Sequence, residues 1–177
     1  MAMREYYVVG IRPPSNVERL IVEAGNSLFR SHGMVSALAL PPLVVLSAFE
    51  TSPPPPQPFG EVARLSTRGW TIGGRSLYAR IAPEEWVDRV AEHVLACAAE
   101  EGAVPARAPF SVARGLYLSD EAQEALLPEL GELPELTWSP RELTCLLVQC
   151  LDSGAWWEHL LTDEVWRSPL LVRYGRS

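Results

Sequence analysis

Lysine is absent from this chain, and all 15 basic residues are arginine. Without lysine there can be no Schiff-base catalysis, no lysyl-nucleotide intermediate of an ATP-dependent ligase and no lysine-bearing P-loop. Aspartate and glutamate together number 22, so the formal net charge is −7. That balance argues against a broad nucleic-acid surface, which needs a basic face to neutralise phosphates, although it permits a local arginine cleft.

Cysteine and long apolar runs are scarce as well. Cys97, Cys145 and Cys150 form no C-x-x-C pair, so we expect buried free thiols rather than disulfides, a zinc site or a redox motif. No segment approaches the ~18–20 apolar residues that cross a bilayer, and the first residues lack the apolar region of a signal peptide. We therefore expect a cytoplasmic protein with no membrane partner, no metal and no cofactor.

Hydrophobic residues make up 47% of the 177 residues, enough to bury the core of one domain spanning 1–177. Hydrophobic periodicity predicts the order β-α-β, hairpin, α-β-α-β. The expected strands are 6–11, 43–49, 70–72, 76–81, 110–114 and 143–150, with a strand-like tail at 170–172. The expected helices are 15–28, 83–102, 120–130 and 156–166.

This order divides the chain into two β-α-β halves of comparable length. We predict an α/β (α+β) fold, a single bilobal domain of two pseudo-duplicated halves with antiparallel or mixed sheets and the helices outside. Residues 51–58 read Thr-Ser-Pro-Pro-Pro-Pro-Gln-Pro. Because proline fixes φ and lacks an N–H donor, this segment predicts a stiff polyproline surface loop within the domain.

Four segments carry a resemblance to a known family. They are 7–14 (YVVGIRPP), 41–49 (PPLVVLSAF), 108–114 (APFSVAR) and 141–147 (RELTCLL). Together they resemble the opening strand, the two motif strands and the closing strand of the 2H phosphoesterase superfamily. That group includes bacterial RNA 2′,3′-cyclic phosphodiesterases of the 2′-5′ RNA ligase type. The likeness spans nearly the whole chain, and it bears on fold more than on function because it contains no rare fingerprint.

The resemblance implies a pair of His-x-Thr/Ser motifs, one on each of two inner strands. Strand alternation would point both polar side chains of each motif into one cleft. There one imidazole accepts a proton, the other donates one, and the hydroxyls hold the phosphate. The matching positions here read Pro42-Leu43-Val44 and Pro109-Phe110-Ser111, so only the Ser111 hydroxyl is kept. We interpret both motifs as degenerate.

The histidines do not restore this chemistry. None of the three, at positions 32, 93 and 159, is followed two residues later by threonine or serine, so the two-histidine mechanism is absent. A general base also needs an orienting partner, and the sequence shows none for any of them. His32 is the only one near the first motif strand.

Three residues stay as candidates for binding an anion or a phosphate: Arg114, Ser111 and His32. Arg114 matches an arginine that follows the second motif in the RNA phosphodiesterase branch of the family. The alternative for Arg114 is an ordinary ion pair at a strand end. The alternative for Ser111 is a buried hydroxyl bonded to a neighbouring backbone group.

Tryptophan is unusually dense near the C-terminus, where Trp156 and Trp157 are adjacent and Trp166 follows. The simplest interpretation places one of the adjacent pair in the core and leaves the other partly exposed. The alternative is an aromatic patch for a partner.

Two functional hypotheses follow from these observations. The favoured one is a non-catalytic 2H phosphoesterase-like protein that binds a nucleotide, an RNA end or a protein through a relic cleft. The other is a phosphodiesterase acting on 2′,3′-cyclic or 2′-5′ phosphodiesters with relocated groups. Clustering of the three candidate residues in one pocket would favour the enzyme, whereas apolar side chains filling the cleft would favour the non-catalytic protein. A protein–protein module working through the proline loop or the tryptophans is a third possibility.

Overall fold

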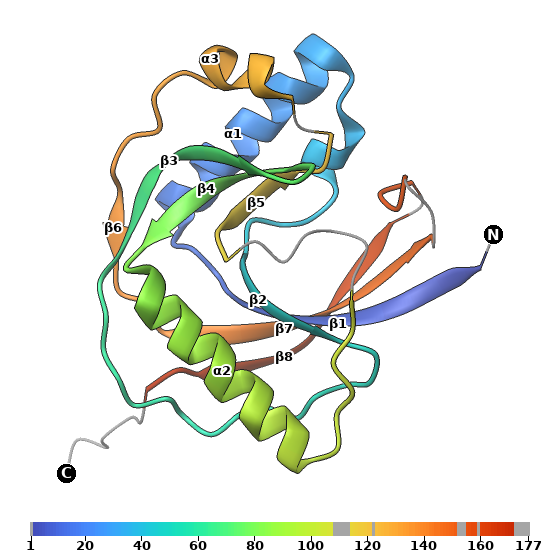
Figure 1. Cartoon of the computed structure of the whole chain (residues 1–177), viewed down its shortest axis with the longest axis vertical. Coiled ribbons are helices and arrows are strands. Elements are labelled where there is room, and N and C mark those ends of the chain that lie inside the picture. Colours follow the sequence, from blue (N-terminus) through green and yellow to red (C-terminus); the bar gives the residue numbers. More distant parts are fainter. Residues whose placement is uncertain (1, 108–113, 122, 152–154, 159, 172–177) are drawn as a thin grey trace.

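The computed structural model describes residues 2–107, 114–121, 123–151, 155–158 and 160–171 (Figure 1). Its strands are β1 (Met3–Ile11), β2 (Val44–Phe49), β3 (Leu65–Gly73), β4 (Ser76–Ala82), β5 (Leu116–Ser119), β6 (Thr137–Trp138), β7 (Glu142–Leu151) and β8 (Leu161–Pro169). Its helices are α1 (Ser15–His32), α2 (Glu84–Glu100) and the short α3 (Leu127–Leu130), with 3-10 turns η1 (Val35–Leu38) and η2 (Glu124–Leu126).

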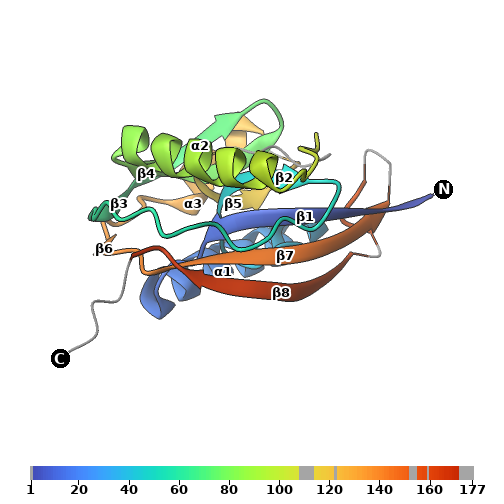
Figure 2. The ribbon, with the colours of Figure 1, turned by 90° about the horizontal axis from the view of Figure 1, so that it is seen from below.

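The eight strands form one sheet in the order β6-β3-β4-β5-β2-β1-β7-β8, and every pairing is antiparallel. Two four-stranded groups, β6-β3-β4-β5 and β2-β1-β7-β8, meet at a single Cα pair between Val44 and Leu116. Figure 2 shows β1, β7 and β8 side by side in the second group. The predicted single-domain α+β fold is confirmed, and the alternative of a mixed sheet is wrong because the described strands include no parallel pair. The two groups are not the consecutive β-α-β halves that we expected, because β1 and β2 share one group with β7 and β8.

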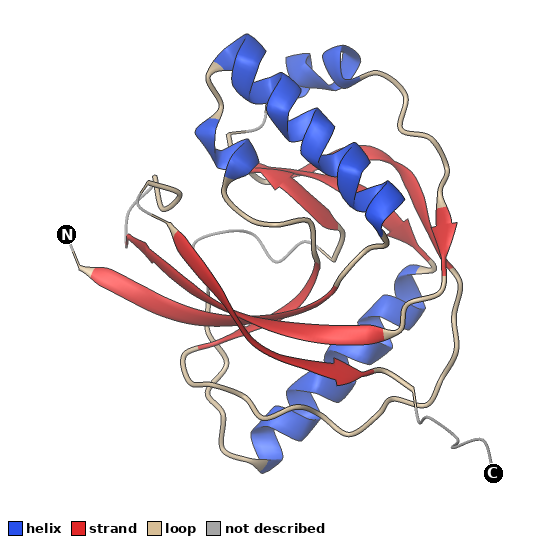
Figure 3. Cartoon of the chain, turned by 180° about the vertical axis from the view of Figure 1, so that it is seen from behind, coloured by secondary structure: helices blue, strands red, loops and turns tan. Residues whose placement is uncertain are grey.

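The two long helices lie on opposite sides of the molecule (Figure 3). Helix α1 begins where Pro14 accepts the backbone N–H groups of Val17 and Glu18, and it ends at Gly33, which has φ +65°. Helix α2 buries Trp86, with Val87, Val90, Ala91 and Val94, in the main core. The apolar stripes predicted for both helices are confirmed, since each turns its three- and four-residue repeat inward.

The last quarter of the chain differs from expectation. The helix predicted at 156–166 is wrong, because Leu161–Pro169 is the edge strand β8, paired along its length with β7. Strand β5 was not predicted, and most of the strand expected at 110–114 lies outside the described residues. The helix expected at 120–130 is reduced to η2 and α3. The proline segment 51–58 is without helix or strand, as predicted.

Gly25 sets how closely α1 approaches η1. A Cβ added there would lie 2.5 Å from the backbone oxygen of Ala37. We predict that Gly25→Ala lowers the free energy of unfolding by about 1–2 kcal/mol, because overpacking costs roughly 1–3 kcal/mol and outweighs the ~1 kcal/mol gain in helix propensity. Urea denaturation measures this. The exposed Glu23→Ala on the same helix is the control, and a Gly25→Ala protein as stable as wild type would contradict the packing.

The three cysteines are free thiols, as expected, and differ in exposure. Cys145 and Cys150 are fully buried, and burial raises the pKa of Cys145 to about 12. Cys97 is half-buried on α2, with its Sγ 3.7 Å from Nε2 of His93. Because a thiolate must form at the surface to react, we predict that one thiol per native chain reacts with a chromogenic disulfide reagent near pH 8. That reaction should disappear in Cys97→Ser, whereas denatured wild type should react at all three; fast labelling of native Cys97→Ser would refute the prediction.

Candidate functional site

The face of β2 that lies away from the α2 core is where the family resemblance would place a cleft. Val44, Leu46 and Phe49 belong to the main core with α2. The opposite face joins a second buried cluster, which we call the inner cluster. Its members come from β1, the β2 region, β5, β7 and the segment before β8: Tyr6, Val8, Leu43, Val45, Ala48, Tyr117, Leu146, Val148, Cys150 and Trp156. The inner cluster therefore draws side chains from both halves of the sheet.

Trp156 closes the inner cluster. It is 1% exposed, and its ring packs on Tyr117 at a centroid separation of 6.2 Å. Its indole N–H donates to a carboxylate oxygen of Asp120, whose other oxygen accepts the Ser76 hydroxyl at 2.6 Å. Trp157 packs edge-on against Trp156 and is half-buried. The expected division of this pair, one tryptophan in the core and one partly exposed, is confirmed.

Three buried hydroxyls, those of Ser47, Tyr117 and Ser119, have no hydrogen-bond partner among the residues that the structure describes. Burial, with smaller contributions from the charges of Asp120 and Glu121, raises the pKa of Tyr117. The phenol is therefore neutral at physiological pH and cannot act as a general base.

The first degenerate motif, Pro42-Leu43-Val44, does not point both of its outer residues into the expected cleft. Val44 is fully buried in the main core and pairs with Leu116, so it points away from the inner cluster. Its neighbours Leu43 and Val45 occupy the inner face instead. Pro42 is buried and borders a depression of about 390 Å³, together with Tyr117. Whether the motif positions are taken as Pro42 and Val44 or as Leu43 and Val45, their side chains are apolar.

Two of the three candidate anion-binding residues lie in the described part of the chain, and each pairs with a carboxylate on a different helix. Arg114 forms an ion pair with Asp88 of α2. His32, at the end of α1, places its Nε2 2.5 Å from a carboxylate oxygen of Glu129 in α3. Ser111 and Pro109, the second degenerate motif, lie outside the described residues. Arg114 thus adopts the ordinary ion pair given as its alternative, and His32 has an acidic partner that the sequence did not reveal.

His93 is held by the proline segment, since its Nε2 lies 2.6 Å from the carbonyl oxygen of Gln57. His159 falls outside the described residues. Among the residues described, no group of three or more His, Cys, Asp or Glu could hold a metal ion. No described helix is long and apolar enough to cross a membrane.

Sequence reasoning missed the Trp156–Asp120–Ser76 arrangement. In the sequence Asp120 is only the first residue of the helix expected at 120–130, a position where aspartate commonly caps a helix. In the structure Asp120 is 6% exposed and its backbone N–H reaches the Ser36 hydroxyl. Its partners lie 36 and 44 residues away in the chain, so no local pattern could have indicated them.

No family model and no curated protein matches this sequence, whereas solved structures do. Escherichia coli LigT complexed with 3′-AMP matches with a TM-score of 0.60 and 16% identity, over 96% of this chain and 99% of that one. LigT complexed with NADP⁺ matches with a TM-score of 0.61 and 14% identity, over 97% and 100%. A crystal structure described as a phosphoesterase matches with a TM-score of 0.57 and 16% identity, over 97% and 100%. The likeness is one of architecture, and the chain has the fold of E. coli LigT, the 2H phosphoesterase-like fold that its four segments resembled.

Proposed function

We propose that this chain is a non-catalytic protein built on a 2H phosphoesterase-like fold. The observation that carries the proposal is the inner cluster, in which Leu43, Val45, Tyr117 and Trp156 occupy the inner face of both halves of the sheet. A phosphodiesterase needs that face open and lined with groups that move protons. Here the described side chains of that face are mainly apolar and buried.

The physical cost of placing a phosphate in the inner cluster supports this view. Moving an unpaired charge into an apolar interior costs several kcal/mol. The one buried carboxylate beside the cluster, that of Asp120, would repel a phosphate, and both of its oxygens already accept hydrogen bonds from Trp156 and Ser76. A phosphodiester would therefore meet the repulsive charge of Asp120, and the unpaired donors described there are the neutral hydroxyls of Ser47, Tyr117 and Ser119.

The remaining opening of the relic cleft suits an apolar ligand better than a phosphate. It is the depression of about 390 Å³ between α1, the segment 37–42, β5 and the start of β8. Its lining is largely apolar and includes Val22, Leu38 and Pro42, and the one charged residue, Glu18, is acidic. Of the three ligand classes expected from the sequence, we therefore assign to this cleft a protein partner rather than a nucleotide or an RNA end.

The decisive experiment is a turnover assay. We predict that purified protein hydrolyses neither 2′,3′-cyclic AMP nor a 2′-5′-linked diadenylate above the rate without protein, as followed by chromatography of the products. An enzyme with known 2′,3′-cyclic phosphodiesterase activity under the same conditions is the comparison for assay sensitivity. Turnover that disappears in Arg114→Ala or His32→Ala would overturn the proposal and establish an enzyme with relocated groups.

A second prediction concerns the closure of the inner cluster. Trp156→Phe keeps an apolar ring but removes the N–H that donates to Asp120, leaving a buried carboxylate short of one donor. We expect the free energy of unfolding to fall by about 1–3 kcal/mol. Trp157→Phe is the matched control and should change it by less than ~0.5 kcal/mol, since Trp157 is only half-buried. Equal effects of the two substitutions in guanidinium denaturation would argue against Trp156 as the closing residue.

A further inference from the structure

A second concavity, far larger than the relic cleft, lies where β1 ends, β7 begins and β8 ends. Its volume is about 1190 Å³, and its lining includes three of the chain's arginines, Arg12, Arg141 and Arg167. We call it the arginine groove. Figure 1 shows these strand ends on the side of the molecule away from the N-terminus.

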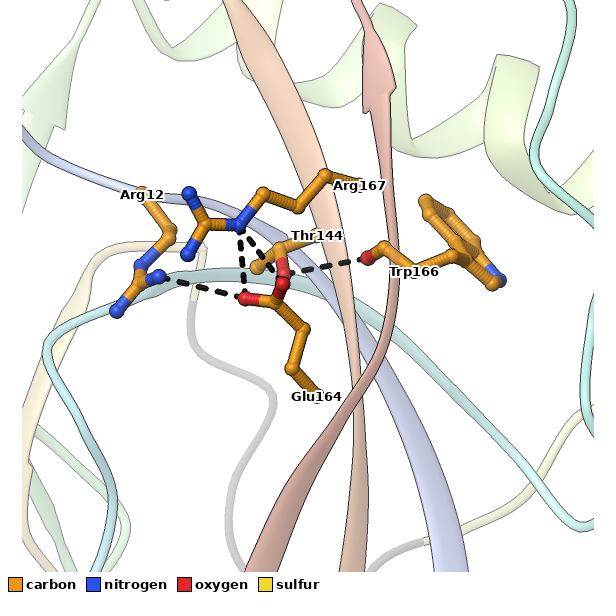
Figure 4. A network of polar contacts seen from close by, with 5 residues as sticks. All are labelled: Arg12, Thr144, Glu164, Trp166 and Arg167. Carbon is orange, nitrogen blue, oxygen red and sulfur yellow. Dashed lines mark hydrogen bonds and ion pairs between the residues drawn. The ribbon is translucent and has the colours of Figure 1, made fainter.

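Two of the arginines are held side by side by one carboxylate (Figure 4). Nε of Arg167 donates to both oxygens of Glu164, at 2.9 and 2.8 Å. An NH1 nitrogen of Arg12 lies 3.4 Å from the same carboxylate. A guanidinium carries five N–H donors, so each retains donors that Glu164 does not take. Glu164 therefore acts as a built-in anion that orients two guanidinium groups at the groove.

The third arginine is fixed by its backbone rather than by an acidic partner. The carbonyl oxygen of Arg141 accepts the N–H of Leu170 at 2.9 Å. Within the described residues the exposed Arg141 side chain has no ion pair. Trp138 lines the groove as well, 8% exposed, and its indole N–H has no acceptor among the described residues. The wall thus offers a guanidinium and an indole N–H that no other described residue uses.

Charge balance decides what kind of anion fits. Glu18 and Glu142 also line the groove, so with Glu164 the three arginines face three glutamates. A wall without net charge exerts little long-range attraction on a polyanion such as RNA. It can still bind a compact anion through direct charge-assisted hydrogen bonds, which guanidinium groups make to phosphate in a paired, planar geometry.

We propose that the arginine groove binds a small phosphate monoester of about mononucleotide size. The phosphate contacts Arg141 and the unused donors of Arg12 and Arg167, and the organic part lies along the wall formed by Trp138 and neighbouring prolines. The groove is roomy enough for this, since pockets for small molecules are usually about 300–1,000 Å³. The proposed phosphate site is separate from the relic cleft, so it can bind a ligand whether or not the relic cleft is occupied.

Isothermal titration calorimetry with 5′-AMP as the probe tests the proposal. We expect 5′-AMP to bind wild type and adenosine to bind at least ten times more weakly, because adenosine lacks the phosphate. Arg141→Ala should weaken 5′-AMP binding about tenfold or more. Arg80→Ala is the matched control: it removes an equal charge from an exposed arginine that pairs with Glu84 and does not line the groove, so it should leave binding unchanged.

A gain-of-affinity variant separates a built site from nonspecific attraction. Glu164→Gln keeps the shape of the side chain and one oxygen that can accept from the arginines, but it removes the negative charge that would repel the phosphate. We expect it to strengthen 5′-AMP binding about threefold to tenfold. The proposal is overturned if wild type and Glu164→Gln both fail to bind, if adenosine binds as well as 5′-AMP, or if Arg141→Ala and Arg80→Ala have the same effect.

Discussion

The junction between β2 and β5 is the constraint on which the rest of the structure depends. A single Cα pair, Val44 with Leu116, connects two four-stranded groups that are each held by long antiparallel ladders. One pair cannot by itself fix the angle between the groups, so packing on both faces of the junction must do so. On one face α2 contacts both β2 and β4, and on the other the inner cluster joins β5 to β1 and β7.

Because the inner cluster packs between the two groups of strands, its side chains are mainly apolar. If Tyr117, Leu43 and Val45 hold the two halves together, that face cannot also be an open, hydrated catalytic cleft. The buried hydroxyls of Ser47 and Ser119 are a cost of the arrangement, about 1–3 kcal/mol for each unpaired group. Trp156 and Asp120 add a buried, charge-assisted hydrogen bond to the same closure. A shared fold does not by itself bring a shared function, because function depends on the residues of the site.

The absence of lysine determines which groups carry positive charge on the surface. Positive charge is carried only by guanidinium groups, which can bind a carboxylate and still present further donors. Arg114 with Asp88 and Arg89 with Glu61 are simple surface pairs of this kind, and such exposed pairs contribute little to stability. Glu164 is different because two arginines converge on it beside a large concavity. This pair of converging guanidinium groups lies at strand ends, away from the inner cluster.

The sequence alone determined the strands 6–11 and 143–150, the hairpin around Gly74 and both long helices, because each is a local repeat of apolar residues bounded by proline or glycine. It also determined that no His-x-Thr/Ser motif is present, which follows from residue identity. Only the tertiary structure decided that 161–169 is an edge strand: Trp157 and Leu161 have helical spacing, but pairing with β7 overrides it. The same holds for the closure by Trp156 and the convergence of Arg12 and Arg167 on Glu164, because contacts between residues far apart in the chain leave no trace in any local pattern.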